Sequence, residues 1–241
     1  MYRKSTVDPA NPPCAALQPI WEQLDECDRD AIWKAVTLKR FSAGQTLYLQ
    51  GDDSPGIYCI ESGLIGLRRS DEKGNSALLR LAKTGDMLGY RSVRQACPQH
   101  NTAEVLADAK VSSIESGKIR WLISRSRVLH DHLFQKALQD LDRTEACCAE
   151  LLTSGLKERL LNLLLDLHDT CVDRHQVDQS RFELPIQKKD IAALLGTSPA
   201  ALSRVISLLE RDGDVSLKGR QISITKHVGD QRMMAEDRYV A

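Results

Sequence analysis

The sequence lacks the features of a membrane, secreted or strongly charged protein. Its 33 Lys and Arg residues balance 33 Asp and Glu residues, so the chain as a whole has no excess charge to attract a polyanion. No apolar run is long enough to span a bilayer, and the first residues lack the apolar core of a signal peptide. We therefore expect a cytoplasmic protein with no membrane partner.

Paired cysteines and catalytic constellations are also missing. The cysteines are odd in number and none stands in a CxxC pair, so neither a disulfide scaffold nor a zinc ribbon fits. His130 and His132 lie two residues apart on a predicted helix and point in different directions. No Ser/His/Asp order and no carboxylate pair in a glycine-lined site stands out. We expect no metal site and no enzyme activity.

The 241 residues include two regions of different composition. Over residues 38–114, glycines punctuate short segments rich in β-branched residues, leucine and tyrosine, which predicts a small antiparallel barrel or sandwich. Glycine then almost disappears, and residues 119–152 are predicted to be mostly helical. The chain is long enough for two modest domains, each with its own core.

The predicted helix carries a heptad-like stripe. Its members are Phe134, Leu141 and Cys148, seven residues apart, with Ala137, Thr144 and Leu151 at the interleaved positions. Such a stripe packs either on its own domain or against a second copy, and three heptads are the minimum for a coiled coil. Spacing alone leaves both readings open.

Near the C-terminus, one short helix has clear start and stop signals. Ser198 is a good N-cap, Pro199 suits the first helical position and Gly213 suits the end. Leu202, Val205 and Leu209 form its inward face. The outward face therefore consists of small side chains and a single arginine, which suits close approach to a grooved partner; it comprises Ala200, Ala201, Ser203, Arg204 and Ser207.

The preceding residues complete a helix-turn-helix pattern. Counting from Lys188, apolar residues occupy positions 4, 5, 8, 15 and 18 and Gly196 occupies position 9, as two steeply crossing helices require. The stretch VSLKGRQISIT then alternates apolar and polar residues about Gly219, which predicts a hairpin. A helix-turn-helix followed by a hairpin is a winged helix.

The second helix of such a unit enters the major groove of DNA, where an arginine can bind a guanine bidentately. Residues 187–226 hold seven basic residues against four acidic ones, a mild local excess that permits binding to phosphates. The predicted contacts with double-stranded DNA are Lys188, Lys189, Thr197, Ser198, Ala200, Ser203, Arg204, Ser207, Lys218 and Arg220.

Residues about 20 to 228 resemble the CRP/FNR superfamily of bacterial transcription regulators. The resemblance to its β-roll sensor is carried by FSAG (41–44), GD (51–52), YCIESG (58–63) and GDMLG (85–89). The resemblance to its winged helix is carried by LPI (184–186), DIA (190–192) and LSR (202–204). Each piece is loose by itself, and their order and spacing make the combination specific.

The resemblance implies an α+β fold with a cupin-like antiparallel β-roll, a long dimerisation helix and a C-terminal winged helix-turn-helix. The expected domains are an irregular tail (1–19), the β-roll (20–118), the dimerisation helix (119–154), the winged helix (155–228) and a C-terminal tail (229–241). It also implies a homodimer that binds a palindrome and contacts RNA polymerase if it activates. The dimer interface, which we call the seam, would comprise Phe134, Ala137, Leu141, Cys148 and Leu151.

Departures from the family concern the signal. Members that bind cyclic AMP have a glutamate where this chain has Tyr90, and an Arg-Ser or Arg-Thr pair where it has Asn101-Thr102. Members with a [4Fe–4S] cluster have closely spaced N-terminal cysteines, whereas Cys14 stands alone and Ser112 occupies the barrel position. We expect neither ligand. Ala200 replaces a common glutamate, so the family's half-site does not carry over in full.

A possible effector pocket is predicted from Tyr90, Cys97, His100, Asn101 and Thr102. Cys97-Pro98 with His100 leaves a haem-binding gas or redox sensor open as an alternative. A further alternative is a ligand-binding regulatory subunit without DNA binding. The effector, the target genes and the choice between activation and repression do not follow from the sequence.

Overall fold

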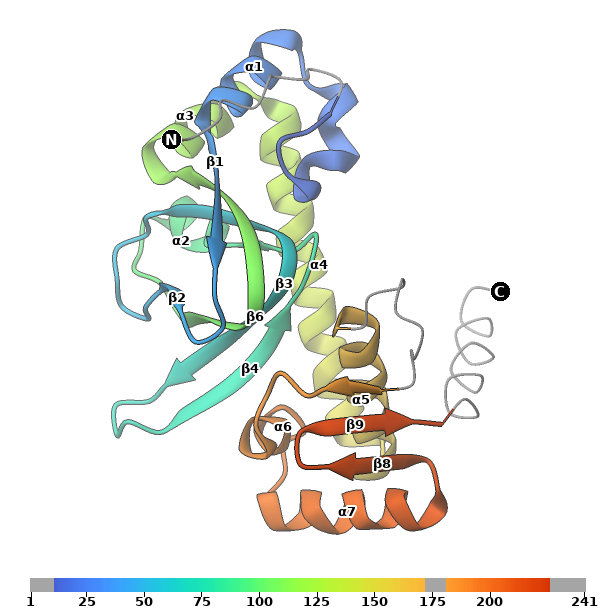
Figure 1. Ribbon diagram of the computed structural model, residues 1–241. Helices are drawn as coiled ribbons and strands as arrows, with labels where there is room; N and C mark the ends of the chain where they lie inside the picture. Colours follow the sequence, from blue (N-terminus) through green and yellow to red (C-terminus); the bar gives the residue numbers. More distant parts are fainter. Residues whose placement is uncertain (1–10, 172–180, 226–241) are drawn as a thin grey trace. The chain divides into compact units, whose positions relative to one another are not determined.

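The computed structural model describes residues 11–171 and 181–225. It divides into two compact units, Met1–Glu145 and Ala146–Ala241, which are described separately (Figure 1). The predicted tail over 229–241 lies outside the described residues, as do residues 1–10. Within the described ranges no single helix is both long and apolar enough to cross a membrane, although the bent pair formed by residues 188–194 and 199–212 passes that test of length and composition.

The first unit begins with two short helices. The 3-10 helix η1 (Ala15–Gln23) is followed by α1 (Glu26–Ala35), whose N-cap Asp25 accepts a hydrogen bond from the Asp28 N–H. The prediction of an irregular tail over residues 1–19 is therefore wrong from Ala15 onward. Leu17 and Trp21 are almost fully buried, so packing of apolar side chains on the core orders this segment.

An antiparallel sheet follows, in the order β1-β6-β3-β4, with β2 paired to β6 and β5 paired to β3. Its strands are β1 (Val36–Phe41), β2 (Thr46–Tyr48), β3 (Gly56–Ser70), β4 (Ser76–Ala82), β5 (Met87–Leu88) and β6 (Thr102–Glu115), and α2 (Tyr90–Gln95) lies between β5 and β6. Two long strands, β3 and β6, thus form its centre (Figure 1).

Register shifts in β3 allow this long strand to curl. They fall between Ile60 and Ile65 in its pairing with β6. Gly63 lies in this segment at φ +99°, and a Cβ there would collide with the Asp108 carbonyl and with Ala109. Only glycine accepts both the positive φ and the close approach of β6.

The first unit has two apolar cores. One fills the inside of the roll and includes Ile60, Ile65 and Val111. The other lies between the roll and the helices, where Trp21, Ile57 and Leu129 pack together. Because successive residues of a strand point to opposite faces, Ile57 and Ile60 serve different cores. The predicted antiparallel β-roll is confirmed.

Two helices replace the single helix predicted over residues 119–154. They are α3 (Ser116–Arg125) and α4 (Arg127–Thr153). Between them Ser126 is buried in a β-region conformation, and its hydroxyl accepts a hydrogen bond from the Leu129 N–H at 3.5 Å. Ser126 is thus an N-cap for α4. The apolar periodicity continues on both sides of Ser126, so the sequence pattern predicted one helix instead of two.

His132 on α4 is buried, and its Nε2–H donates to the Ala16 carbonyl oxygen at 2.8 Å. Burial lowers the pKa of His132 below its ordinary value of 6.5; the hydrogen bond to Ala16 opposes this shift, and the Lys136 charge adds to it. The unfolded chain therefore binds this proton at higher pH than the folded chain. The stability that neutral His132 contributes is present above pH 6.5 and is lost as the pH falls through the folded pKa.

We expect the thermal midpoint to fall on acidification from about pH 7.5 to about pH 5.5. His132→Gln keeps a donor for Ala16 but does not titrate, so its midpoint should fall less over the same interval. Calorimetry of both proteins measures the difference, and equal falls would remove His132 from the acid response.

The second unit begins with the last turns of α4, which are followed by α5 (Leu156–Cys171). A three-stranded sheet in the order β7-β9-β8 and two further helices complete it: β7 (Arg181–Glu183), α6 (Lys188–Leu194), α7 (Pro199–Asp212), β8 (Val215–Lys218) and β9 (Gln221–Ile224). The predicted hairpin is confirmed as β8 and β9, which pair in antiparallel register. β7 was not predicted, because three residues are too few for a periodic signal.

Candidate nucleic-acid interface and sensor cavity

Local signals set the ends of α7. The Ser198 side chain accepts a hydrogen bond from the Ala201 N–H at 3.2 Å, and Pro199 occupies the first turn. Gly213 ends the helix in the left-handed conformation at φ +79°. The predicted helix from Ser198 to Gly213 is confirmed.

The turn before α7 produces the steep crossing that a helix-turn-helix needs. The axes of α6 and α7 differ in direction by 98°. Gly196 in the turn has φ +60°, and Leu195 and Leu202 are buried beneath it. Arg159 of α5 donates from Nη2 to the Leu195 carbonyl oxygen at 3.1 Å, which ties the end of α6 to α5.

The predicted DNA contacts on α6 and α7 are exposed, except for half-buried Thr197. Arg204 is exposed and has no hydrogen-bond or ion-pair partner among the described residues, so its guanidinium is available to a ligand. The Ser203 hydroxyl donates to the Pro199 carbonyl oxygen at 2.9 Å, so in this arrangement it offers an acceptor to a base. Lys188 and Lys189 lie in the first turn of α6, and both are exposed.

The two wing residues differ. Lys218 is exposed at the hairpin tip, beside Gly219 at φ +67°. Arg220 donates from Nε and Nη2 to the Leu184 carbonyl oxygen at 3.2 and 2.8 Å, and its Nε lies 3.3 Å from a Glu183 carboxylate oxygen. These bonds tie the Arg220 side chain to Glu183 and Leu184, at the end of β7. Its contact with DNA stays a prediction.

Apolar side chains are exposed along α4. Phe134 is 57% exposed and Leu141 53%, and Cys148 and Leu151 are exposed farther along the helix. Ala137 differs, because it is half-buried against the core of its own unit. Leu138 and Leu152, which the seven-residue spacing did not include, are 39% and 87% exposed. Exposed large apolar residues on one helix are typical of an interaction surface.

Two neighbouring cavities lie between the roll and α4 within the first unit. The smaller, which we call the inner cavity, has a volume of about 60 Å³, and the larger, which we call the outer cavity, has a volume of about 1010 Å³. Of the five residues predicted for an effector pocket, Tyr90, His100 and Asn101 line both. Cys97 and Thr102 line neither. The Thr102 hydroxyl accepts a hydrogen bond from the Gln50 N–H, and the Cys97 Sγ atom lies 3.5 Å from His100 Nε2.

A hydrogen-bonded ion cluster lies beside the inner cavity. Arg80 of β4 binds Asp140 of α4, with 2.7 Å between Nη1 and Oδ2, and the Tyr90 hydroxyl donates to the same Oδ2 atom at 2.8 Å. Asp86 binds Arg143 of α4 at 2.8 Å and lies 3.6 Å from Arg80. Two arginines and two carboxylates thus join α4 to the roll.

The electrostatics of the cluster follow from this arrangement. Burial by itself lowers the pKa of Arg80, but the hydrogen bond with Asp140 and the charges of Asp140 and Asp86 raise it above its usual value overall. Burial, followed by the hydrogen bond to Asp140, raises the pKa of Tyr90, so its hydroxyl stays protonated and donates.

The inner cavity does not fit a cyclic nucleotide. Small-molecule sites have volumes of about 300–1000 Å³, far above 60 Å³. The family resemblance aligns Tyr90 and Asn101 with the glutamate and arginine of nucleotide binders, and Asp140 already binds Arg80. Arg80, Asp86, Asp140 and Arg143 were not predicted as site residues, because no spacing connects residues so far apart in the chain.

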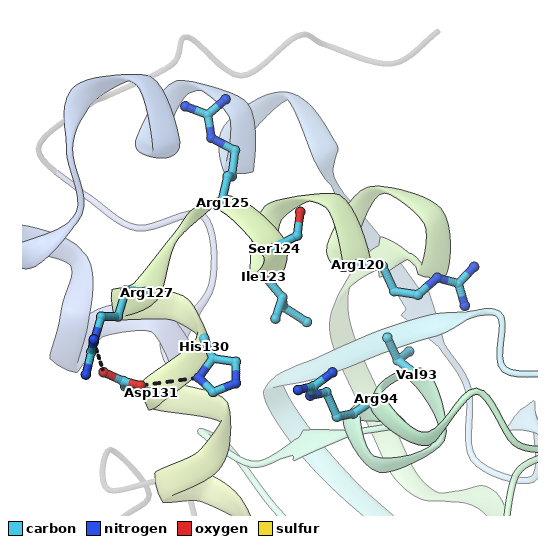
Figure 2. A pocket seen from close by; sticks show the side chains of 9 residues that line it. All are labelled: Val93, Arg94, Arg120, Ile123, Ser124, Arg125, Arg127, His130 and Asp131. Atoms are coloured by element: carbon cyan, nitrogen blue, oxygen red, sulfur yellow. Dashed lines mark hydrogen bonds and ion pairs between the residues drawn. The ribbon is translucent and has the colours of Figure 1, made fainter.

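Another pocket, of about 680 Å³, lies among α2, α3 and the start of α4 (Figure 2). Its lining residues are Val93, Arg94, Arg120, Ile123, Ser124, Arg125, Arg127, His130 and Asp131. Figure 2 shows Arg120 and Arg125 pointing away from its centre, whereas Arg94 and His130 point toward each other. Arg125 also binds buried Asp28 at 2.9 Å. The arginines therefore do not converge on one point.

Comparison with known proteins identifies both units. A family model described as a cyclic nucleotide-binding domain matches residues 38–126, and one described as a Crp-like helix-turn-helix domain matches residues 158–227. The chain is similar to the transcriptional regulator LdrP of Thermus thermophilus, with 25% identity over 77% of this chain and 90% of that protein. It is also similar to the CRP-like cAMP-activated global transcriptional regulator of Mycobacterium tuberculosis, with 22% identity over 81% of this chain and 87% of that protein.

The fold agrees with these matches. The structure of FixK2 from Bradyrhizobium japonicum superposes with a TM-score of 0.67 at 18% identity, covering 81% of this chain and 96% of that chain. Both domain types occur in the order expected for a sensor followed by a helix-turn-helix. The chain therefore belongs to the CRP/FNR superfamily of transcription regulators.

Proposed function

We propose that this transcription regulator binds a palindromic DNA site as a homodimer and responds to a signal at the β-roll. The observation that carries the proposal is the outward face of α7, which presents small side chains around Arg204, exposed and without a partner among the described residues. Small residues permit close approach to base edges, and the arginine supplies two parallel donors to guanine.

Dimerisation is supported by the exposed apolar side chains of α4. Phe134 and Leu141 are each more than half exposed, which is costly in water and favourable at a seam. Both also line the outer cavity, so a partner helix at this seam would form part of the cavity wall. A ligand there would act on the dimer directly.

A signal at the roll is supported by Asn101. Its Oδ1 atom is buried without a hydrogen-bond partner among the described residues, and the residue lines both cavities. A buried acceptor left unpaired costs about 1–3 kcal/mol, which a water or an effector donor would offset. The haem alternative, which needs Cys97 or His100, stays a prediction, as does contact with RNA polymerase.

Selection of bound duplexes from a random-sequence pool tests the proposal. We expect enrichment of a palindrome whose half-site centres lie about one helical turn, ~34–36 Å, apart, because a dyad relates the two recognition helices. Sedimentation of the complex should give two chains per duplex. Enrichment of a single, non-repeated site would contradict the dimer, and no enrichment of any sequence would contradict specific binding.

A further inference from the structure

Asp140 binds where an anion entering the sensor cavity would bind. Its carboxylate contacts Arg80 of β4 and Tyr90 of α2, a cation and a hydroxyl donor that line both cavities, as Arg91 also does. We propose that Asp140 is an internal anionic ligand of the sensor, which holds α4 on the β-roll without an external effector. This inference rests on the proposed function, because it concerns how the sensor controls DNA binding.

The size of the inner cavity supports this assignment. With Asp140 in place, about 60 Å³ is left, room for about two waters at the ~30 Å³ each occupies in the liquid. Asp140 and Arg80 are 21% and 26% exposed at their side chains, so water screens their attraction only in part. An external anion that took over this bond to Arg80 would have to displace Asp140.

The charges of the cluster are balanced without a ligand. Arg80 and Arg143 face Asp86 and Asp140, and the other Asp86 oxygen accepts a hydrogen bond from the Lys83 N–H. An external anion would add a negative charge to a neutral cluster. It would also compete with a carboxylate that the chain already holds in position, which gives Asp140 a high effective concentration.

The position of Asp140 links the cluster to the predicted seam. The next residue, Leu141, is 53% exposed, whereas Asp140 contacts the roll. Adjacent helical residues point about 100° apart, so the bond to Arg80 fixes the direction in which Leu141 points. Release of Asp140 would free α4 to rotate and would change the surface offered to a second chain.

DNA affinity of the full-length protein without added small molecules tests the proposal, with fluorescence anisotropy on the selected duplex. We expect wild type to bind and Asp140→Ala to bind at least about tenfold more weakly, the scale of an allosteric coupling. The matched control is Asp142→Ala, which removes an exposed carboxylate from the same helix and should leave affinity unchanged.

Chemical rescue separates an internal ligand from a structural role. Asp140→Ala keeps Cβ and leaves a space of the shape of formate beside Arg80, so sodium formate should restore much of its affinity relative to sodium chloride at equal ionic strength. Asp140→Asn fills that space without a charge, so it should lose affinity and show no rescue. Circular dichroism confirms that each variant is folded.

The outcomes are distinct from those of the proposed function. Full affinity of Asp140→Ala, or a loss that formate does not reverse, would overturn the internal ligand. If the wild-type protein binds its site only after a small-molecule extract is added, the internal ligand is also overturned. That outcome would leave the proposed DNA-binding function intact. If wild type selects no DNA sequence under any condition, the proposed function itself fails.

Discussion

Replacing Arg204 by alanine should weaken binding to the preferred duplex by about 1–3 kcal/mol, or about 5- to 150-fold, and abolish the preference for guanine at one position of each half-site. Arg204 lies in the first half of α7, the part of a recognition helix that reaches base edges, and it is exposed and unpaired among the described residues. Competition assays with duplexes altered at each position measure both effects.

Two controls define what this loss means. Lys188→Ala removes a cation from the start of α6 and should weaken binding to all sequences alike, with a salt dependence smaller by about one ion. Arg211→Ala removes an exposed arginine from the far end of α7 and should leave base preference unchanged. Unaltered affinity and selectivity in Arg204→Ala would show that another face of the unit contacts the bases.

Leu141→Asp should convert the proposed dimer into monomers and reduce affinity for the proposed palindrome by about 10²- to 10⁴-fold, because a monomer loses the avidity of two linked recognition helices. Leu141 is 53% exposed on α4, so a single chain tolerates a charge there. At a seam related by a dyad, two buried like charges would face each other without compensation. Sedimentation velocity and binding to one and two half-sites measure the two consequences.

A charge at a neighbouring position serves as the control. Gln139→Asp adds the same charge to an exposed position on another side of α4 and should stay dimeric. Mixing Leu141→Asp with Leu141→Lys should restore two-chain complexes, because opposite charges would then meet across the dyad. Intact dimers of Leu141→Asp would place the seam elsewhere.

The helix-turn-helix and its wing were predictable because their signals are local. Ser198, Pro199 and Gly213 mark helix ends through their own backbone preferences and side-chain bonds, which act within a few residues. Gly219 marks the hairpin tip in the same way. The fold class of the roll was predictable because its glycines and β-branched residues recur. The lengths of β3 and β6 were not predictable from this pattern.

The sequence by itself determined the order of the domains, the winged helix and the exposed position of Arg204, all of which follow from short-range periodicity and turn chemistry. Only the tertiary structure decided that Asp140 binds Arg80 and Tyr90, sixty and fifty positions away in the chain. It also decided that Ala137 faces its own core and that Cys97 and Thr102 stay outside the cavities. These outcomes depend on which face of α4 packs against the roll, and the heptad spacing left that choice open because either face of the helix can be buried.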